Sequence, residues 1–221
     1  MVHSRPQRKA PKHACLPATV AARNAAARSV SGFESPLSIP PAMGRGWEEG
    51  QFRYTTGMDE QELHDRLTAL GVPFAIIPCD PALADTANFC AAYGYPLEDS
   101  ANTILVTGKV DPPVYAACVV LAHTRLDVNR TVRQRLGVRK ASFAPAEETR
   151  ALTGMEIGGV TLFGLPPTIP IWVDVRVMAR ERIILGGGSR SCKVIATPDI
   201  LRALPNVEVI EGLAGEPAPA G

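Results

Sequence analysis

The hydrophobic pattern is irregular over residues 1–57 and becomes regular immediately after them. Leu63 and Leu67 lie four positions apart, on one face of a helix, which predicts an amphipathic helix. Asp59 occupies the N-cap position of this helix, and Gly71 follows its end, where a left-handed residue is favoured. We therefore expect the ordered part of the chain to start with this helix.

Short runs rich in β-branched residues follow the helix and predict strands. Two of them, at 103–107 and 114–121, are separated by a turn with two prolines and predict a β-hairpin. Further strands are predicted at 72–78, 139–143, 169–175, 182–185, 192–197 and 207–210. Additional helices are predicted at 81–94, 127–136, 145–153 and 198–204. Asp127 and Pro145 mark the starts of the second and the third of these. These interspersed helices and strands predict a mixed α/β domain over residues 58–212.

The two ends of the chain have compositions that do not favour packing. Residues 1–57 contain six prolines and five glycines without a sustained period, so we expect them to be disordered. Their Arg- and Ala-rich start is typical of an organellar transit peptide. An upstream extension of the gene model, with the natural start at Met43 or Met58, explains it equally well. Residues 213–221, rich in Gly, Ala and Pro, are expected to form a second disordered tail.

The composition of the chain is that of an average globular protein. Of its 221 residues, 46% are apolar and 20% are charged. The longest apolar run, at 114–122, has the length of a strand and is too short to span a bilayer. Five widely spaced cysteines without a C-x-x-C pair predict neither a disulfide framework nor a zinc site, so a reducing cytoplasm is the expected compartment. Four histidines without an H-E-x-x-H motif likewise predict no metal site.

Charge is distributed unevenly along the chain. Residues 1–57 hold eight basic and three acidic residues, whereas the rest of the chain holds fifteen basic and nineteen acidic ones. A slightly acidic body does not bind nucleic acid through a broad basic surface, so any RNA contact must be local. The densest basic group comprises Arg130, Arg133, Arg135, Arg139 and Lys140. A solvated helix face and a contact with an RNA stem both explain this group.

The common catalytic motifs are missing from the sequence. It has no G-x-S-x-G elbow, no G-x-x-x-x-G-K-[ST] loop and no G-x-G-x-x-G that opens a helix. Two glycine clusters remain, TGMEIGGVTLFGLPP at 153–167 and LGGGSRS at 185–191. Glycine lets main-chain N–H groups approach a ligand closely, so such loops can bind a carbonyl oxygen or an oxyanion. The alternative is that these glycines only form a hairpin turn and a bulge.

Three stretches of the sequence carry a family resemblance: LDVNRTVRQRLG, RKASFAPAEETRALTGMEIGGVTLFG and ILGGGSRSCKVIATPDIL. They resemble the YbaK/EbsC family of aminoacyl-tRNA deacylases, which are relatives of the editing domain of bacterial prolyl-tRNA synthetases. The most specific motif is T-G-x-x-x-G-G-V-[ST] at 153–161, and the resemblance covers residues 58–212.

The resemblance implies a curved mixed β-sheet surrounded by helices. It also implies hydrolysis of the ester that joins a wrong amino acid to the 3′-terminal adenosine of a tRNA, without metal or cofactor. Backbone N–H groups would bind the aminoacyl carbonyl, and a ribose hydroxyl of the substrate would help to activate the attacking water. The implied catalytic residues are Gly158, Gly159, Val160, Thr161 and Asn102. The implied substrate-binding residues are Thr103, Gly187, Gly188, Ser189 and Arg190. Aminoacyl-tRNA is the expected partner, with an aminoacyl-tRNA synthetase as a second one and no membrane.

The sequence departs from the family pattern at three places in the implied cleft. Asn102 stands where the family places a lysine in the first hairpin strand, and Leu162 stands where it places a proline. Cys79 and Pro81 stand where an aromatic residue and a histidine are often found. The lysine matters most, because a hydrogen bond to a charged group is worth about 1.5–3 kcal/mol.

Three basic residues are candidates to replace the missing lysine. Lys109 lies in the hairpin turn, seven residues from Asn102, which is too far along an extended strand. Lys193 follows the second glycine cluster, whereas Arg190 lies within it. We expect Arg190 to be the replacement, and a solvated turn arginine is the alternative.

Together these features predict a trans-acting hydrolase that deacylates mischarged tRNA. The alternative is a catalytically weak or inactive binding module for aminoacyl-tRNA or a related nucleotide ester. A third interpretation is a synthetase partner that acts through protein association. Position 102 distinguishes the first two, because an enzyme needs a compensating donor for Asn102 and a pure binding module does not.

Overall fold

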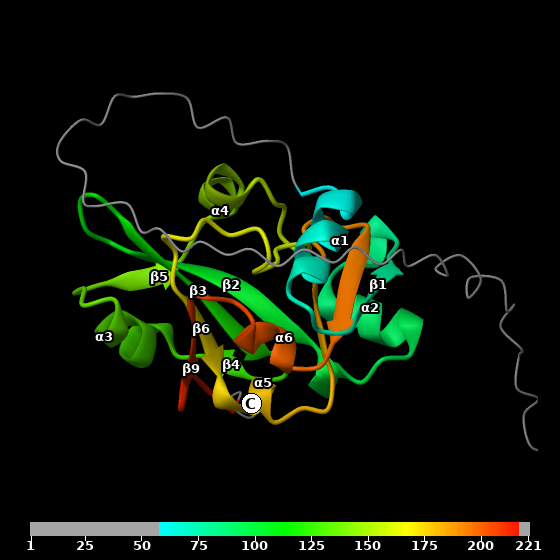
Figure 1. Ribbon diagram of the computed structural model, residues 1–221. Coiled ribbons are helices and arrows are strands. Elements are labelled where there is room, and N and C mark those ends of the chain that lie inside the picture. The colour runs from blue at the N-terminus through cyan, green and yellow to red at the C-terminus, as the bar shows by residue number, and fades with distance from the viewer. Residues whose placement is uncertain (1–57, 217–221) are drawn as a thin grey trace, which may run out of the picture. The chain divides into compact units, whose positions relative to one another are not determined.

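The computed structural model describes residues 58–216 (Figure 1), and the predictions for residues 1–57 and 217–221 lie outside this range. The helices are α1 (Glu60–Ala69), α2 (Thr86–Tyr93), α3 (Arg133–Arg135), α4 (Ala146–Thr153), α5 (Val175–Met178) and α6 (Asp199–Arg202), with the helical turns η1 (Pro81–Leu83), η2 (Leu97–Asp99) and η3 (Val128–Val132). The strands are β1 (Phe74–Pro78), β2 (Ala101–Gly108), β3 (Val114–Leu121), β4 (Arg125–Leu126), β5 (Ala141–Phe143), β6 (Ile171–Asp174), β7 (Ile183–Gly186), β8 (Cys192–Ala196), β9 (Val207–Ile210) and β10 (Ala214–Gly215). The predicted mixed α/β class is confirmed. None of the helices between residues 58 and 216 has the length and hydrophobicity needed to cross a membrane.

Helix ends follow the capping signals in the sequence. The side chain of Asp59 accepts a hydrogen bond from the Glu62 N–H at 2.7 Å, which fixes the start of α1. Gly94 and Gly154 end α2 and α4 with φ angles of +73° and +70°. Residues with a side chain rarely adopt such angles, so these glycines determine where the two helices stop.

Two sheets form the body of the molecule. The five-stranded sheet has the order β5-β2-β3-β6-β9 and is mixed, because β2 is antiparallel to its neighbours β3 and β5 while β6 is parallel to β3 and β9. The three-stranded sheet, with the order β1-β8-β7, is antiparallel. A parallel bridge between Ser100, just before β2, and Ile184 of β7 joins them. Figure 1 shows the β2–β3 hairpin crossing the middle of the molecule, with β1, α1 and α2 to one side. The sheets therefore meet where β2 begins.

The β2–β3 hairpin lies between two hydrophobic clusters. Alternate residues of a strand point to opposite faces, so Leu105 and Val119 join the main core while Val106 and Val120 join a second cluster. Helices α1 and α6 contribute buried side chains to the main core, and Trp172 contributes to the second cluster. The hairpin is thus buried on both faces, which explains why its sequence does not alternate between apolar and polar residues.

Two predicted helices are interrupted. The 81–94 segment forms η1 and α2, with extended backbone at Asp85 (φ −65°, ψ +136°). Between them the Ala84 carbonyl accepts a hydrogen bond from Lys193 Nζ at 2.6 Å. The 127–136 segment forms the wide turn η3 followed by α3, although the Asp127 side chain caps it by accepting from the Arg130 N–H. The Asp127 cap was predicted correctly, whereas the continuity of both helices was wrong because it depends on tertiary contacts.

The predicted disorder from residue 213 onward is wrong for residues 213–216. Leu213 is fully buried, and β10 pairs with β4. The Ala214 N–H also donates to the buried carboxylate of Asp174 at 2.9 Å. Composition alone missed this segment because its order comes from one apolar anchor and from pairing with a distant strand. The ordered domain therefore extends beyond residue 212.

Candidate active site

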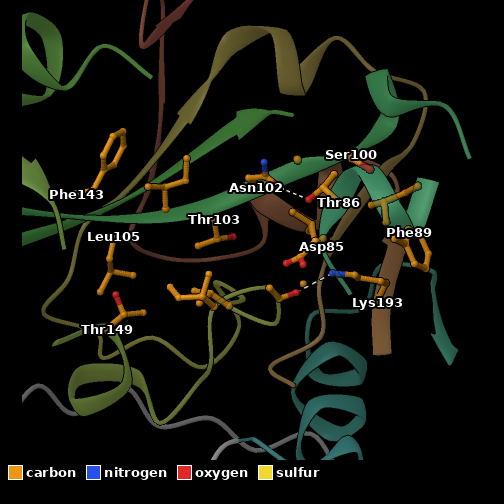
Figure 2. Close-up of a pocket in the computed structure, with 18 of the residues that line it drawn as sticks. Asp85, Thr86, Phe89, Ser100, Asn102, Thr103, Leu105, Phe143, Thr149 and Lys193 are labelled. Carbon is orange, nitrogen blue, oxygen red and sulfur yellow. Dashed lines mark hydrogen bonds between the residues drawn. The ribbon is translucent and has the colours of Figure 1, made fainter. Parts of the chain in front are cut away.

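A cavity of about 380 Å³ lies where the two sheets meet (Figure 2). Its walls come from β2, β5, β7, β8, the start of α2 and the loop after α4. Four of the ten predicted site residues line it: Asn102, Thr103, Gly158 and Val160. The topology thus brings the first glycine loop and the first hairpin strand together around one cavity.

The cavity has an apolar end and a polar end. Leu105, Phe143 and Thr149 lie at one end in Figure 2, on β2, β5 and α4. Asp85 and Lys193 lie at the other end, together with Thr86. This arrangement fits an elongated ligand with an apolar group at one end and a polar group at the other.

The first glycine loop forms a tight turn after α4. The Gly159 N–H donates to the Glu156 carbonyl at 2.9 Å, which closes the turn, and Gly158 has a φ angle of +92° that favours glycine. Among residues 58–216, no acceptor is found for the N–H groups of Gly158 and Val160. Both residues line the cavity, so these two amides are available as donors to a ligand.

The two glycine clusters pack against each other through their backbones. The Gly188 N–H donates to the Gly159 carbonyl at 2.8 Å. A Cβ atom on Gly159 would lie 2.4 Å from the carbonyl carbon of Ser189, and one on Gly186 would lie 2.2 Å from the Val160 carbonyl oxygen. Glycine is therefore required at both positions because neither leaves room for a side chain. The alternative that each cluster forms only an isolated turn does not fit this packing.

The other six predicted site residues lie outside the cavity lining: Gly159, Thr161, Gly187, Gly188, Ser189 and Arg190. The N–H groups of Gly159 and Gly188 are already bound to neighbouring carbonyls. Thr161 is fully buried, and its N–H is directed to Met155 Sδ at 3.4 Å. From the second cluster, Gly186 lines the cavity in their place. The available backbone N–H donors identified at the cavity thus come from the first glycine loop.

Asn102 and Thr103 lie at the start of β2. Asn102 Oδ1 accepts a hydrogen bond from Thr86 Oγ1 at 2.8 Å, which ties β2 to the first turn of α2 (Figure 2). The Thr103 hydroxyl is buried, and no partner for it is found within residues 58–216. The side-chain amide oxygen of Asn102 therefore already accepts a hydrogen bond, whereas the Thr103 hydroxyl is available to a ligand in the cavity.

Arg190 holds the glycine loop and does not line the cavity. It donates to the Ile157 carbonyl through Nη1 at 2.8 Å and to the Pro81 carbonyl through Nε at 3.0 Å. Its Nη1 also lies 3.3 Å from Asp85 Oδ1. These contacts connect the loop to η1 and to the start of α2. Arg190 is thus a poor replacement for the missing lysine, contrary to our expectation.

Lys193 on β8 is the basic residue that lines the cavity within residues 58–216. It is 6% exposed, and its ammonium donates to the carbonyls of Ala84 and Gly158 at 2.6 and 2.8 Å. Burial lowers the pKa of Lys193 below its ordinary value. The sequence signal for this residue was a lysine inside a strand whose neighbours, Cys192 and Val194, are apolar. The sequence alone favours Arg190 over Lys193 as the replacement.

The other departures from the family pattern lie away from the ligand space. Leu162 is 2% exposed and belongs to the main hydrophobic core. Cys79 is buried in a separate cluster with Phe89, and burial raises the pKa of its thiol. Neither Leu162, Cys79 nor Pro81 lines the cavity. Within the described part of the chain, no group of three or more His, Cys, Asp and Glu side chains is arranged to hold a metal ion.

The dense basic group is divided between different roles. Arg135 pairs with Glu208, and its guanidinium lies 5.2 Å from the centre of the Trp172 ring. Arg133 donates to the Asn129 carbonyl at 2.7 Å. Arg130, Arg139 and Lys140 are exposed. Structural roles thus account for part of the group.

A family model for the aminoacyl-tRNA editing domain matches residues 80–204. This region contains β2, both glycine clusters and the whole cavity lining. The chain therefore belongs to the aminoacyl-tRNA editing domain family, and the membership supports a deacylase role. A search of curated protein sequences found no match.

Solved structures share the fold at low sequence identity. The hypothetical protein APE2540 is 23% identical with a TM-score of 0.62, and the alignment covers 69% of this chain and 99% of that protein. A proposed trans-editing enzyme for prolyl-tRNA synthetase is 21% identical with a TM-score of 0.61, with 72% and 97% of the two chains covered. The mixed sheet with surrounding helices is thus an editing-domain fold.

Proposed function

We propose that this protein is a trans-acting deacylase that hydrolyses the ester of mischarged tRNA. The observation that carries the proposal is the pair of amides, Gly158 N–H and Val160 N–H, which have no acceptor within residues 58–216 and line the cavity. Unpaired amides at a concave site are suited to bind an oxygen that becomes negative during acyl transfer. Membership of the editing family supports an amino acid on a tRNA as the acyl group.

The reaction adds water across one ester bond. The water oxygen attacks the carbonyl carbon, and the carbonyl oxygen acquires negative charge while it accepts hydrogen bonds from Gly158 and Val160. The bond from the carbonyl carbon to the ribose oxygen then breaks, and the ribose oxygen takes a proton from the attacking water. The products are the free amino acid and a tRNA with a free terminal hydroxyl. Each such backbone donor contributes about 3 kcal/mol of transition-state stabilisation.

The two ends of the cavity suggest how the substrate lies. The apolar end, with Leu105 and Phe143, fits an aliphatic amino-acid side chain, because it offers no charged partner. The polar end, with Asp85, Thr86 and Lys193, fits the ester and the terminal ribose. The aligned region accounts for nearly the whole of the two solved structures, which supports action in trans by a free-standing domain.

The second candidate function is a binding module that retains the ester without hydrolysing it. It is favoured by Asn102, which is uncharged and whose carbonyl oxygen is already bound to Thr86. This candidate predicts affinity for charged tRNA without turnover.

A deacylation screen distinguishes the two functions. The full chain is incubated with tRNAs that carry non-cognate alanine, serine, cysteine or valine, and the release of the amino acid is followed over time. We expect at least one aliphatic ester to be hydrolysed faster than the correctly charged tRNA. Binding of charged tRNA without hydrolysis of any ester would eliminate the enzyme and leave the binding module.

A further inference from the structure

Lys193 has an unused hydrogen-bond donor at the cavity. An ammonium has three N–H groups, and two of them donate to the carbonyls of Ala84 and Gly158; Figure 2 shows the contact with Gly158. Within residues 58–216, the third N–H has no acceptor. Because Lys193 lines the cavity, this donor is available to a ligand there.

Some neighbours of Lys193 destabilise its protonated form and others stabilise it. Burial lowers its pKa below the ordinary value of 10.5, and Arg190 acts in the same direction, while Cys79, Asp85 and Cys192 act against them. A lysine is rarely buried without a partner, and the two carbonyls are neutral. The Phe89 ring, whose centre lies 5.7 Å from Nζ, is a further neutral contact, so a ligand oxygen that develops negative charge would add an anionic hydrogen-bond partner.

The resemblance places a lysine at position 102 on β2, where this chain has Asn102. Asn102 and Lys193 line the same cavity from different strands. The ammonium lies 2.8 Å from the carbonyl oxygen of Gly158, in the loop that also carries the two available amides. The positive charge is therefore present in the cavity but comes from β8 instead of β2.

We infer that Lys193 replaces the family lysine and donates a hydrogen bond to the acyl oxygen of an aminoacyl-adenosine ester. This inference rests on the proposed function and extends it to a further residue that contacts the substrate. The ammonium and the amides of Gly158 and Val160 together form one set of donors to the same oxygen.

The test measures binding of an alanyl-adenosine analogue in which an amide replaces the 3′ ester, so that it cannot be hydrolysed. Lys193→Gln retains N–H donors for the Ala84 and Gly158 carbonyls and removes the charge, and Lys193→Met removes both. We expect each variant of the full chain to bind about a hundredfold more weakly than the wild type. Lys140→Gln, which removes an exposed lysine outside the cavity, should bind as the wild type does.

A second variant separates contact with the ligand from a purely structural role. Lys193→Gln combined with Asn102→Lys returns a cation to the family position, and we expect its affinity to come within about tenfold of the wild type. A structural role of Lys193 predicts no such recovery. Thermal melts of all variants establish that they are folded.

The pH dependence supplies an independent readout. Only the protonated ammonium donates to the ligand with full charge, and the lowered pKa means that Lys193 loses its proton at a pH below 10.5. Wild-type affinity should therefore fall on the alkaline side below that pH, and Lys193→Gln should lack this decline. The α-amino group of the analogue titrates equally in both proteins and cancels in the comparison.

The outcomes for Lys193 and for the proposed function can be told apart. Weaker binding by Lys193→Gln with recovery by the double variant supports the inference, even if the wild type hydrolyses no tRNA and the proposed function fails. Wild-type affinity in Lys193→Gln, a folded double variant without recovery, or no analogue binding by the wild type overturns it. If Lys193→Gln binds the analogue with wild-type affinity but the wild-type protein hydrolyses mischarged tRNA, the inference about Lys193 fails and the proposed function remains supported.

Discussion

We expect Gly159→Ala to lower the deacylation rate by about a hundredfold or more. The new Cβ would lie 2.4 Å from both the carbonyl carbon and the carbonyl oxygen of Ser189, which are backbone atoms and cannot rotate away. The two glycine clusters must then separate, and the hydrogen bond from the Gly188 N–H to the Gly159 carbonyl is lost. Because Gly158 and Val160 flank the substituted residue, their amides move away from the acyl oxygen.

Gly215→Ala is the matched control, because a Cβ there meets no atom within 4 Å. It should deacylate as the wild type does, and thermal melts should show both variants to be folded, since overpacking of this kind costs about 1–3 kcal/mol. Full activity in Gly159→Ala would mean that the position of the loop backbone does not determine the rate.

Arg190→Met is expected to reduce kcat by about a hundredfold with little change in KM. The arginine holds the Ile157 carbonyl and the Pro81 carbonyl at 2.8 and 3.0 Å, so its loss releases the loop from η1. A displacement of about 1 Å at the reacting groups is enough for a loss of this size. Arg190→Lys should recover only part of the rate, because one ammonium does not reproduce the fork that reaches both carbonyls.

The sequence predicts that Arg190 contacts the substrate directly, whereas the structure gives it a positioning role. The kinetic constants kcat and KM distinguish these two roles. A rise in KM with unchanged kcat would show that Arg190 binds the ligand itself. Arg202→Met is the control, since Arg202 is exposed and its ion pair within the described part of the chain is with Asp199, three residues away on α6. It should leave both constants unchanged.

Local signals predicted most of the fold. Asp59 and Gly71 flank α1, and the β-branched runs at 103–107 and 114–121 became β2 and β3. These signals lie within a few residues of the elements they define, so a single sequence contains them. The short pair β4–β10 was missed because Leu213 is buried by residues distant in the sequence.

The candidate site was predictable only in part for the same reason. The motif located the first glycine loop, but which of its amides are unpaired depends on the turn that Gly159 closes with Glu156. Arg190 and Lys193 are three residues apart, and their separate roles follow from where β8 starts and from which carbonyls each side chain reaches. Sequence spacing does not contain that information.

The most direct test of the central claim maps the binding site of the alanyl-adenosine amide analogue by ¹⁵N chemical shifts of the full chain. The account predicts the largest shifts at the amides of Gly158 and Val160, because both donate to the acyl oxygen of the bound ligand. A separate pocket is lined by Arg125 and Asn129. Unchanged amides at Gly158 and Val160, with shifts confined to that pocket, would contradict the account.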